Sequence, residues 1–291
     1  MIRTLYVLGL LFLLAAVSMS CGGGERGSSD PDPLRVGLVP NQNPEKVEAE
    51  YEPFGDYLSQ RLGREVKLAV PTSYNAVVEA MASGELDLAY FGGLTYVQAR
   101  ERTDVSPLVT EINPYTHTTK YHSLIIAPAD SPIQNVEDIK GKTFAFGSVS
   151  STSGSLYPAI MLRDAGIDYR TDLGEKTYTG GHDATAQAVA NGRVDAGGLE
   201  DRILYNLEKD GTIDESKVRT VKESDPIEGY PWVVRDALSD GLKEEIVQAF
   251  LSIEDPKLLD LLRAEGYERV SAEDYDYVEE QAKDLELINA Q

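Results

Sequence analysis

The sequence predicts an α/β protein of two lobes, each with a mostly parallel sheet flanked by helices. Two observations support this prediction. Short apolar runs typical of buried strands alternate with longer segments in which apolar residues recur at helical spacing. In addition, segment 80–89 is matched by segment 188–197, and the match extends in both directions at the same constant offset. We therefore expect two lobes with the same order of elements and a ligand cleft between them.

The first repeat accounts for the elements of the first lobe. We expect strands over 34–39, 66–70 and 86–91, and helices over 47–62 and 72–81. Gly63 and Gly84 follow the two helices, and glycine commonly ends a helix.

The second repeat and the rest of the chain follow the same alternation. We expect strands over 123–127, 143–146, 175–178, 194–199, 218–221 and 231–234, and helices over 136–139, 156–162 and 184–190. From position 242 onward the spacing predicts only helices, over 242–251, 256–262 and 272–282.

The segment 1–33 has the composition of a targeting segment and a tether. Arg3 precedes an apolar run over 5–17 that is too short for a comfortable membrane span, which is typical of a signal peptide. Small residues then lead to Cys21, as at a bacterial lipoprotein cleavage site, although Ser18 stands where leucine is usual. We predict a signal peptide over 1–20, a lipid on Cys21 and a flexible tether over 21–33. An ordinary secretory signal with an incidental cysteine is the alternative.

Charge and cysteine content exclude several classes of protein. The chain has 27 basic and 49 acidic residues and a formal charge of −22, so non-specific binding to nucleic acid is not expected. A single cysteine allows no internal disulfide. Any anion site in so acidic a protein must be built from local groups.

A hydroxyl-rich loop over 147–154 is the strongest candidate for such a site. It follows the strand over 143–146 and opens a helix, and it contains Ser151, Thr152, Ser153 and Gly154. Hydroxyl donors, close backbone approach at glycine and the unpaired N–H groups of a helix N-terminus together favour a tetrahedral oxyanion. A serine-rich helix cap without a ligand is the alternative.

The constant offset of the repeat gives this loop a partner face across the cleft. Tyr74 aligns with His182, and both open helices, while Phe91 ends a strand of the first lobe. Glu200 follows a buried strand, and its carboxylate would repel an anion unless the ligand carries a proton that the carboxylate can accept. Asp225 is a second candidate for this role, although a turn function is an equal alternative. Neutral donors and one histidine would then hold the anion without a buried cation.

Competing chemistries have little support. The hydroxyl loop lacks the lysine of a nucleotide-binding phosphate loop, and the chain has no G-x-S-x-G motif of a serine hydrolase. The three histidines are too scattered for a metal site. We therefore expect no catalysis, no metal and no cofactor.

The hydroxyl loop, the histidine that opens the next helix and the two predicted lobes resemble the phosphonate-binding proteins of bacterial ABC importers, which include phosphite-binding members. The resemblance covers about residues 34–255. It implies a type II periplasmic-binding-protein fold with chain crossings near Tyr121 and near 229–231. The binding positions that it implies are Tyr74, Tyr121, Ser151, Thr152, Ser153, His182, Glu200 and Asp225, and the cleft lining predicted above adds Phe91.

This resemblance implies capture of a ligand. We expect a monomer with one lobe formed by 34–120 and 228–291 and the other by 121–227, closing on a small phosphorus oxyanion and docking on a membrane permease. An aromatic lid from Tyr74 favours phosphite or methylphosphonate. The alternatives are an anion sensor for a membrane receptor, an enzyme on the same fold, and a binding protein for another oxyanion such as sulfate.

Overall fold

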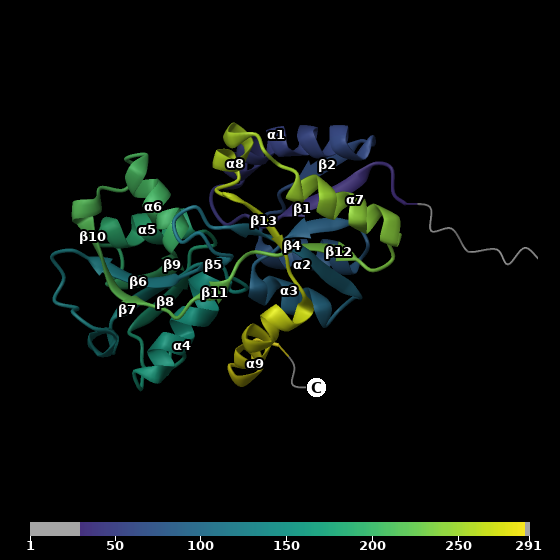
Figure 1. Ribbon diagram of the computed structural model, residues 1–291. Helices are drawn as coiled ribbons and strands as arrows, with labels where there is room; N and C mark the ends of the chain where they lie inside the picture. Colours follow the sequence, from purple (N-terminus) through teal and green to yellow (C-terminus); the bar gives the residue numbers. More distant parts are fainter. Residues whose placement is uncertain (1–29, 289–291) are drawn as a thin grey trace, which may run out of the picture.

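The computed structural model of the protein describes residues 30–288, and its first lobe is built on a six-stranded sheet. The strand order is β13-β4-β12-β3-β1-β2. The strands are β1 (Leu34–Leu38), β2 (Val66–Ala69), β3 (Leu88–Tyr90), β4 (Val105–Ile112), β12 (Trp232–Arg235) and β13 (Gly266–Arg269). The helices of this lobe are α1 (Pro44–Leu62), α2 (Tyr74–Ala82), α3 (Gly93–Arg100), α7 (Asp240–Leu251) and α8 (Pro256–Leu261), and α1, α7 and α8 lie together on one side of the sheet (Figure 1).

The second lobe is built on a five-stranded sheet of order β10-β6-β9-β7-β8. Its strands are β6 (Ser123–Pro128), β7 (Thr143–Phe146), β8 (Glu175–Tyr178), β9 (Ala196–Glu200) and β10 (Val218–Glu223). Its helices are α4 (Tyr157–Asp164), α5 (His182–Ala190) and α6 (Asp201–Lys209), with two short 3₁₀ helices, η1 (Val136–Ile139) and η3 (Glu215–Lys217), and one short π-helix, η2 (Thr152–Leu156).

A short ribbon lies between the two sheets. Strands β5 (Lys120–Tyr121) and β11 (Ile227–Glu228) pair antiparallel, and they are the two segments through which the chain passes between the lobes (Figure 1). The last elements, η4 (Ala272–Tyr275) and α9 (Asp276–Asp284), return to the boundary, where α9 packs on both α3 and η2.

The internal repeat is exact at the level of strand register. Val36 pairs with Leu88 in the first sheet, and Phe144 pairs with Ala196 in the second, so one offset relates both members of the two pairs. Helices α2 and α5 likewise begin at Tyr74 and His182. In each lobe, three parallel strands therefore carry their carboxyl ends to the boundary in the same arrangement.

Two predictions about the fold need correction. The prediction of two α/β lobes is confirmed, but the sheets are mixed rather than mostly parallel, because β12 and β6 run antiparallel to their neighbours. These antiparallel strands adjoin the two crossings, and a chain that leaves one sheet for the other must reverse direction there. The second error concerns the C-terminal segment, which is not entirely helical. Its segment Gly266–Arg269 is β13, which pairs with β4 at the sheet edge.

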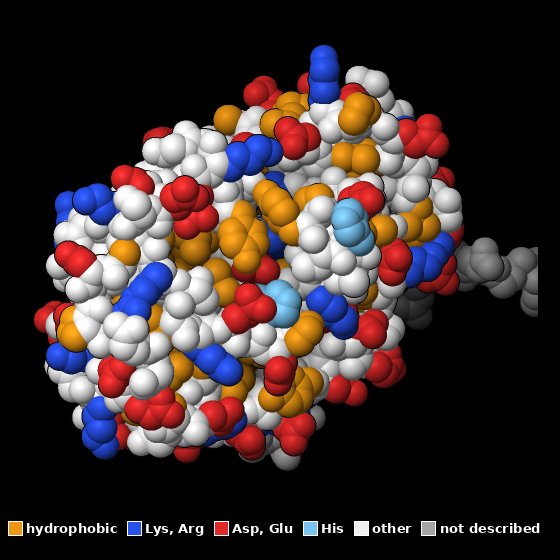
Figure 2. Space-filling model, turned by 60° about the vertical axis from the view of Figure 1, so that its left-hand side comes forward, with side chains coloured by type: hydrophobic (Ala, Val, Ile, Leu, Met, Phe, Trp, Pro, Cys, Tyr) orange, Lys and Arg blue, Asp and Glu red, His pale blue; other side chains and the backbone are white. Residues whose placement is uncertain are grey.

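The core of the first lobe is aromatic. Trp232 is fully buried, and its ring centroid lies 5.1 Å from that of Phe54 and 4.8 Å from that of Phe250, which joins α1, β12 and α7. Acidic and basic side chains are interspersed over the face of the described residues shown in Figure 2. Within residues 30–288, no helix combines the length and apolarity that a membrane crossing requires.

Candidate functional site

The hydroxyl loop connects β7 to η2 at the lobe boundary. Ser151 caps η2, because its Oγ accepts a hydrogen bond of 3.0 Å from the N–H of Gly154. The loop is also drawn together by the N–H of Gly147, which donates to the carbonyl of Gly154 at 2.8 Å. A Cβ at Gly154 would lie 2.9 Å from Ser151 Oγ and 3.0 Å from His182 Cε1. Glycine is therefore required here for the loop to lie against the histidine.

His182 is held in one tautomer by the backbone. Its Nδ1 accepts a hydrogen bond of 3.2 Å from the N–H of Glu200, so the proton of the neutral ring is on Nε2. This Nε2 lies 3.5 Å from Ser151 Oγ and 3.4 Å from Tyr230 Oη. Burial lowers the pKa of His182, which keeps the ring neutral and makes Nε2–H a donor at the centre of the site.

Four of the predicted site residues have buried polar atoms that lack a partner among residues 30–288. These atoms are Tyr74 Oη, Tyr121 Oη, Ser153 Oγ and Glu200 Oε2. Buried polar atoms in folded proteins are nearly always hydrogen-bonded, because an unpaired one costs about 1–3 kcal/mol. Three hydroxyl donors and one carboxylate acceptor are thus available to a small polar ligand.

Glu200 is ionised in spite of its burial. Burial itself works to raise the pKa of this carboxyl, but the charge of Arg202 and the nearby hydroxyl of Tyr230 outweigh it and hold the pKa below its usual value. Arg202 Nε donates to Glu200 Oε1 at 2.6 Å, and Oε2 has no hydrogen-bond partner within residues 30–288. The neighbouring Asp201 has the opposite balance, since burial and the charge of Glu200 raise its pKa to about 6.

Contacts across the boundary close the lobes around this cluster. The N–H of Leu94 in α3 donates to Thr152 Oγ1 at 2.9 Å, and Thr95 Oγ1 donates to the carbonyl of Ser150 at 3.0 Å. On the other side of the cluster, the N–H of His182 donates to the carbonyl of Asn41 at 2.9 Å. Thr152 thus joins the two lobes through its hydroxyl oxygen.

Two of the predicted residues do not join the polar cluster. Phe91 follows β3 and is fully buried as part of the apolar core. Asp225 is exposed, and it lines a separate surface cavity of about 420 Å³ together with Tyr157 and Tyr277. The structure therefore brings together Tyr74, Tyr121, Ser151, Thr152, Ser153, His182 and Glu200.

Sequence reasoning missed three residues around this cluster. Arg202 is 4% exposed and pairs with both Glu200 and Glu111, and Tyr230 contacts His182. The signal for Arg202 was its place two residues after Glu200, since an arginine so close to a buried carboxylate commonly pairs with it. Glu111 gave no such signal, because it lies in β4, far away in the sequence.

Comparisons with known proteins are consistent with this geometry. A family model described as "ABC transporter, phosphonate, periplasmic substrate-binding protein" matches residues 36–275. The chain is 29% identical over 276 residues to the probable ABC transporter phosphite binding protein PhnD1 of Prochlorococcus marinus, covering 89% of this chain and 92% of the relative. It is also 30% identical over 251 residues to the phosphate-import protein PhnD of Mycolicibacterium smegmatis, covering 81% of this chain and 78% of the relative.

A solved structure extends the likeness to three dimensions. PhnD1 of Prochlorococcus marinus in complex with methylphosphonate has a TM-score of 0.79 and 28% identity, with 88% of this chain and 98% of that chain covered. The alkanesulfonate-binding protein SsuA of Xanthomonas axonopodis pv. citri, at a TM-score of 0.63 and 19% identity, covers 89% of this chain and 96% of that chain and shares the fold. The family resemblance predicted from the hydroxyl loop is confirmed.

Proposed function

Because this chain belongs to the family of periplasmic substrate-binding proteins of phosphonate ABC transporters, we propose that its polar cluster holds one small phosphorus oxyanion between the lobes. Members of this family bind and deliver their substrate to an importer and are not enzymes. The observation that carries the proposal is the set of buried atoms on Tyr74, Tyr121, Ser153 and Glu200 that have no partner among the described residues. These residues lie around the hydroxyl loop and His182, so a single small ligand would satisfy them together.

The donors in this cluster favour an anion, and the one acceptor sets its protonation. Ser151, Ser153 and His182 Nε2–H would donate to ligand oxygens, together with the tyrosine hydroxyls. Glu200 Oε2, being ionised, accepts only, so a ligand oxygen beside it must carry a proton. The ligand would therefore be a monoprotonated oxyanion, such as hydrogen phosphite or the monoanion of methylphosphonate.

A panel of ligands tests this proposal. Unfolding temperature is measured with phosphite, methylphosphonate, phosphate, 2-aminoethylphosphonate and sulfate, since a ligand at a given concentration stabilises the folded state more as its affinity rises. We expect phosphite and methylphosphonate to give the largest shifts and sulfate to give none. A Ser151→Ala and Ser153→Ala double variant should lose the shift. The proposal would be contradicted if sulfate gave the largest shift. If phosphate gave the largest shift, this protein would be an importer component for phosphate, as the name of the Mycolicibacterium relative states for that protein.

The ribbon between the lobes is the hinge in this proposal. We keep the predicted boundaries, with 34–120 and 228–291 in one lobe and 121–227 in the other. The pairing of β5 with β11 supports this, because bending at two short adjacent segments lets the lobes open as rigid bodies. Closure by Thr152 and Leu94 across the boundary would then present a closed form to the permease.

The lipid anchor is a further part of the proposal and lies outside the described residues. Cys21 is the only cysteine, and it follows an apolar segment and precedes a polar tether. We propose that it carries the lipid and becomes the first residue of the mature protein. Mass spectrometry of the mature N-terminus should find diacylglycerol-modified Cys21, and a Cys21→Ser variant should leave the membrane fraction. An unmodified N-terminus would instead indicate an ordinary secretory signal.

A further inference from the structure

Arg202 is a buried cation beside the proposed ligand site, and its charge is already paired. Its Nε donates to Glu200 Oε1 at 2.6 Å, and its Nη1 donates to Glu111 Oε1 at 2.6 Å. The guanidinium carbon also lies 4.9 Å from the ring centroid of Tyr121 and 5.5 Å from that of Tyr230. Two carboxylates and two aromatic faces thus fix its position, and they leave it no freedom to move onto the ligand.

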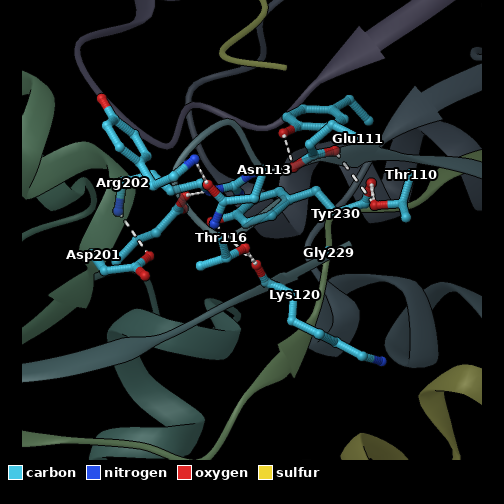
Figure 3. Close-up of polar contacts among 12 residues, drawn as sticks. Thr110, Glu111, Asn113, Thr116, Lys120, Asp201, Arg202, Gly229 and Tyr230 are labelled. Atoms are coloured by element: carbon cyan, nitrogen blue, oxygen red, sulfur yellow. Dashed lines mark hydrogen bonds and ion pairs between the residues drawn. The ribbon is translucent and has the colours of Figure 1, made fainter. Parts of the chain in front are cut away.

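The same contacts connect the two lobes beside the hinge. Glu111 belongs to β4 of the first lobe, where Tyr90 Oη donates to its Oε1 at 3.2 Å. Arg202 belongs to the first turn of α6 in the second lobe. In Figure 3, Thr110 and Glu111 lie on one side of this contact region and Asp201 and Arg202 on the other. The guanidinium is therefore anchored from both lobes.

This anchoring determines what Glu200 offers to a ligand. Arg202 occupies Oε1 alone, so the carboxylate is oriented with Oε2 buried and unpartnered among the described residues. Arginine does not lose its proton in proteins, so the partner of Glu200 stays charged at every physiological pH. A buried histidine or lysine in this position can lose its proton, so neither would keep a positive charge beside Glu200 at every physiological pH.

The surroundings of Glu200 are otherwise unfavourable to a second negative charge. The titratable groups that face it are Arg202 and Asp201 of α6, His182 of α5, Glu111 of β4, Tyr90 of β3, Tyr74 of α2, Tyr121 of β5 and Tyr230 of the hinge. Arg202 is the only permanent cation in this set, and two carboxylates share it. An oxyanion that brings no proton to Oε2 would meet an uncompensated repulsion there.

We propose that Arg202 is a positioning residue that sets the ligand specificity of this site. It holds Glu200 as an oriented anion, and through Glu200 it selects oxyanions that carry an O–H group over isosteric anions that carry none. Arg202 itself does not contact the ligand. This inference rests on the proposed function, because it requires that Glu200 Oε2 faces the bound oxyanion.

Two ligands of equal charge and nearly equal shape isolate this property. In mildly acidic buffer, methylphosphonate is a monoanion with one P–O–H group, and methanesulfonate is a monoanion with no O–H group. The quantity measured is the ratio of their dissociation constants by calorimetry. We expect the wild-type protein to prefer methylphosphonate by on the order of 100-fold or more, since a site built to accept a hydrogen bond rejects a ligand that lacks the donor.

The variants then separate the roles of the two residues. Glu200→Gln and Arg202→Met should each bring the ratio to within about tenfold of one, because an amide or a protonated carboxyl no longer requires a donor on the ligand. The double variant should show no further change in the ratio, since Arg202 acts through Glu200. Arg235→Met is the matched control, because it removes a half-buried arginine from the carboxylate of Asp87 away from the site, and it should keep the wild-type ratio.

The failures are distinguishable. A wild-type ratio in Glu200→Gln would overturn the proposed role of Glu200 and this inference with it. A second outcome is that the ratio falls toward one in Glu200→Gln but stays at the wild-type value in a folded Arg202→Met. This outcome would overturn the inference about Arg202 alone. If Arg202→Met does not fold, Arg202→Lys replaces it. One ammonium group cannot reproduce the hydrogen bonds that the planar guanidinium donates to Glu200 and Glu111, so the ratio should fall several-fold. A wild-type ratio in Arg202→Lys would contradict the inference.

Discussion

At the carboxyl ends of their parallel strands, the two repeats present different side chains from equivalent positions. The first repeat offers Tyr74 and Gly93 where the second offers His182 and Asp201. The helix after the first strand opens at Pro44 in one repeat and at Thr152 in the other. The first lobe thus contributes mainly aromatic surface and backbone groups, whereas the second contributes the hydroxyls, the histidine and the carboxylate.

The strand ends away from the boundary keep the same chemistry in both repeats. The N–H of Arg35 donates to Asp87 Oδ2 at 3.0 Å, and the N–H of Thr143 donates to Asp195 Oδ2 at 2.8 Å, which is the same contact at the equivalent positions of the second repeat. This contact of the scaffold is shared by both repeats, whereas the residues at the edge facing the cleft differ. We propose that the second lobe binds the oxyanion and that the first lobe covers it.

The largest expected effect is a loss of ligand affinity at His182, the counterpart of Tyr74 in the first repeat. His182→Ala removes the Nε2–H donor at the centre of the site, and we expect the affinity for methylphosphonate to fall on the order of 100-fold, as for other hydrogen bonds to a charged group. Calorimetry measures this loss, and circular dichroism checks that the variant is folded. A folded variant with an affinity within about threefold of wild type would assign the anion to other donors.

The next expected effect is on the free energy of unfolding, and it differs between Asp87 and Asp195, which occupy equivalent positions in the two repeats. Asp87 is fully buried and pairs with both Arg35 and Arg235, whereas Asp195 is exposed and, among the described residues, its carboxylate accepts hydrogen bonds from Thr143. Asp87→Ala should lower the free energy of unfolding by about 3 kcal/mol, because two arginines lose their partner. Asp195→Ala should lower it by about 1 kcal/mol. Urea denaturation measures both, and equal effects would show that the repeats are stabilised alike.

A smaller effect follows from Asp201, which takes the place of Gly93. Burial raises the pKa of Asp201 from 3.8 to about 6, so the folded state binds its proton more tightly than the unfolded state does. Its contribution to stability therefore falls as the pH rises from about 4 to 6. Asp201→Asn should raise the free energy of unfolding by about 1–2 kcal/mol at pH 7 and leave it unchanged at pH 4. A gain that is the same at both pH values would rule out this titration as the cause.

The smallest effect is expected at Tyr74, the counterpart of His182. Its hydroxyl is buried without a partner among the described residues, so Tyr74→Phe should stabilise the ligand-free protein slightly, by up to about 1 kcal/mol. The affinity for methylphosphonate should fall about fivefold to tenfold, as for one neutral hydrogen bond. Thermal unfolding should therefore show a gain in stability, and calorimetry should show a loss of affinity. Loss of stability on Tyr74→Phe would mean that the hydroxyl has a structural partner.

The sequence predicted the features that repeat or that are local. The constant offset between the repeats led to the two lobes and to the equivalence of Tyr74 with His182. The alternation of strand and helix patterns led to the strands over 143–146 and 175–178, which coincide with β7 and β8. The hydroxyl loop was recognisable because its composition and its position before a helix are both local properties. These features depend on short segments that can be recognised one at a time.

Other features depend on contacts between distant segments, and the sequence did not predict them. β13 is short and forms only because β4 offers an edge, so its apolar pattern is too brief to identify. The antiparallel direction of β12 depends on where the chain crosses between the lobes. Arg202 is explained by Glu111, which is 91 positions away. Asp225, proposed as a second carboxylate that could accept the proton of the ligand, lies on the exposed surface.

The most direct test of the central claim is a crystal structure of the protein with methylphosphonate bound. We expect the phosphonate oxygens within hydrogen-bond distance of Ser151, Ser153 and His182 in the second lobe, with one protonated oxygen on Glu200 Oε2 and the hydroxyl of Tyr74 covering the ligand. A phosphonate that contacts mainly the first lobe, or that leaves Glu200 Oε2 unpartnered, would contradict the account.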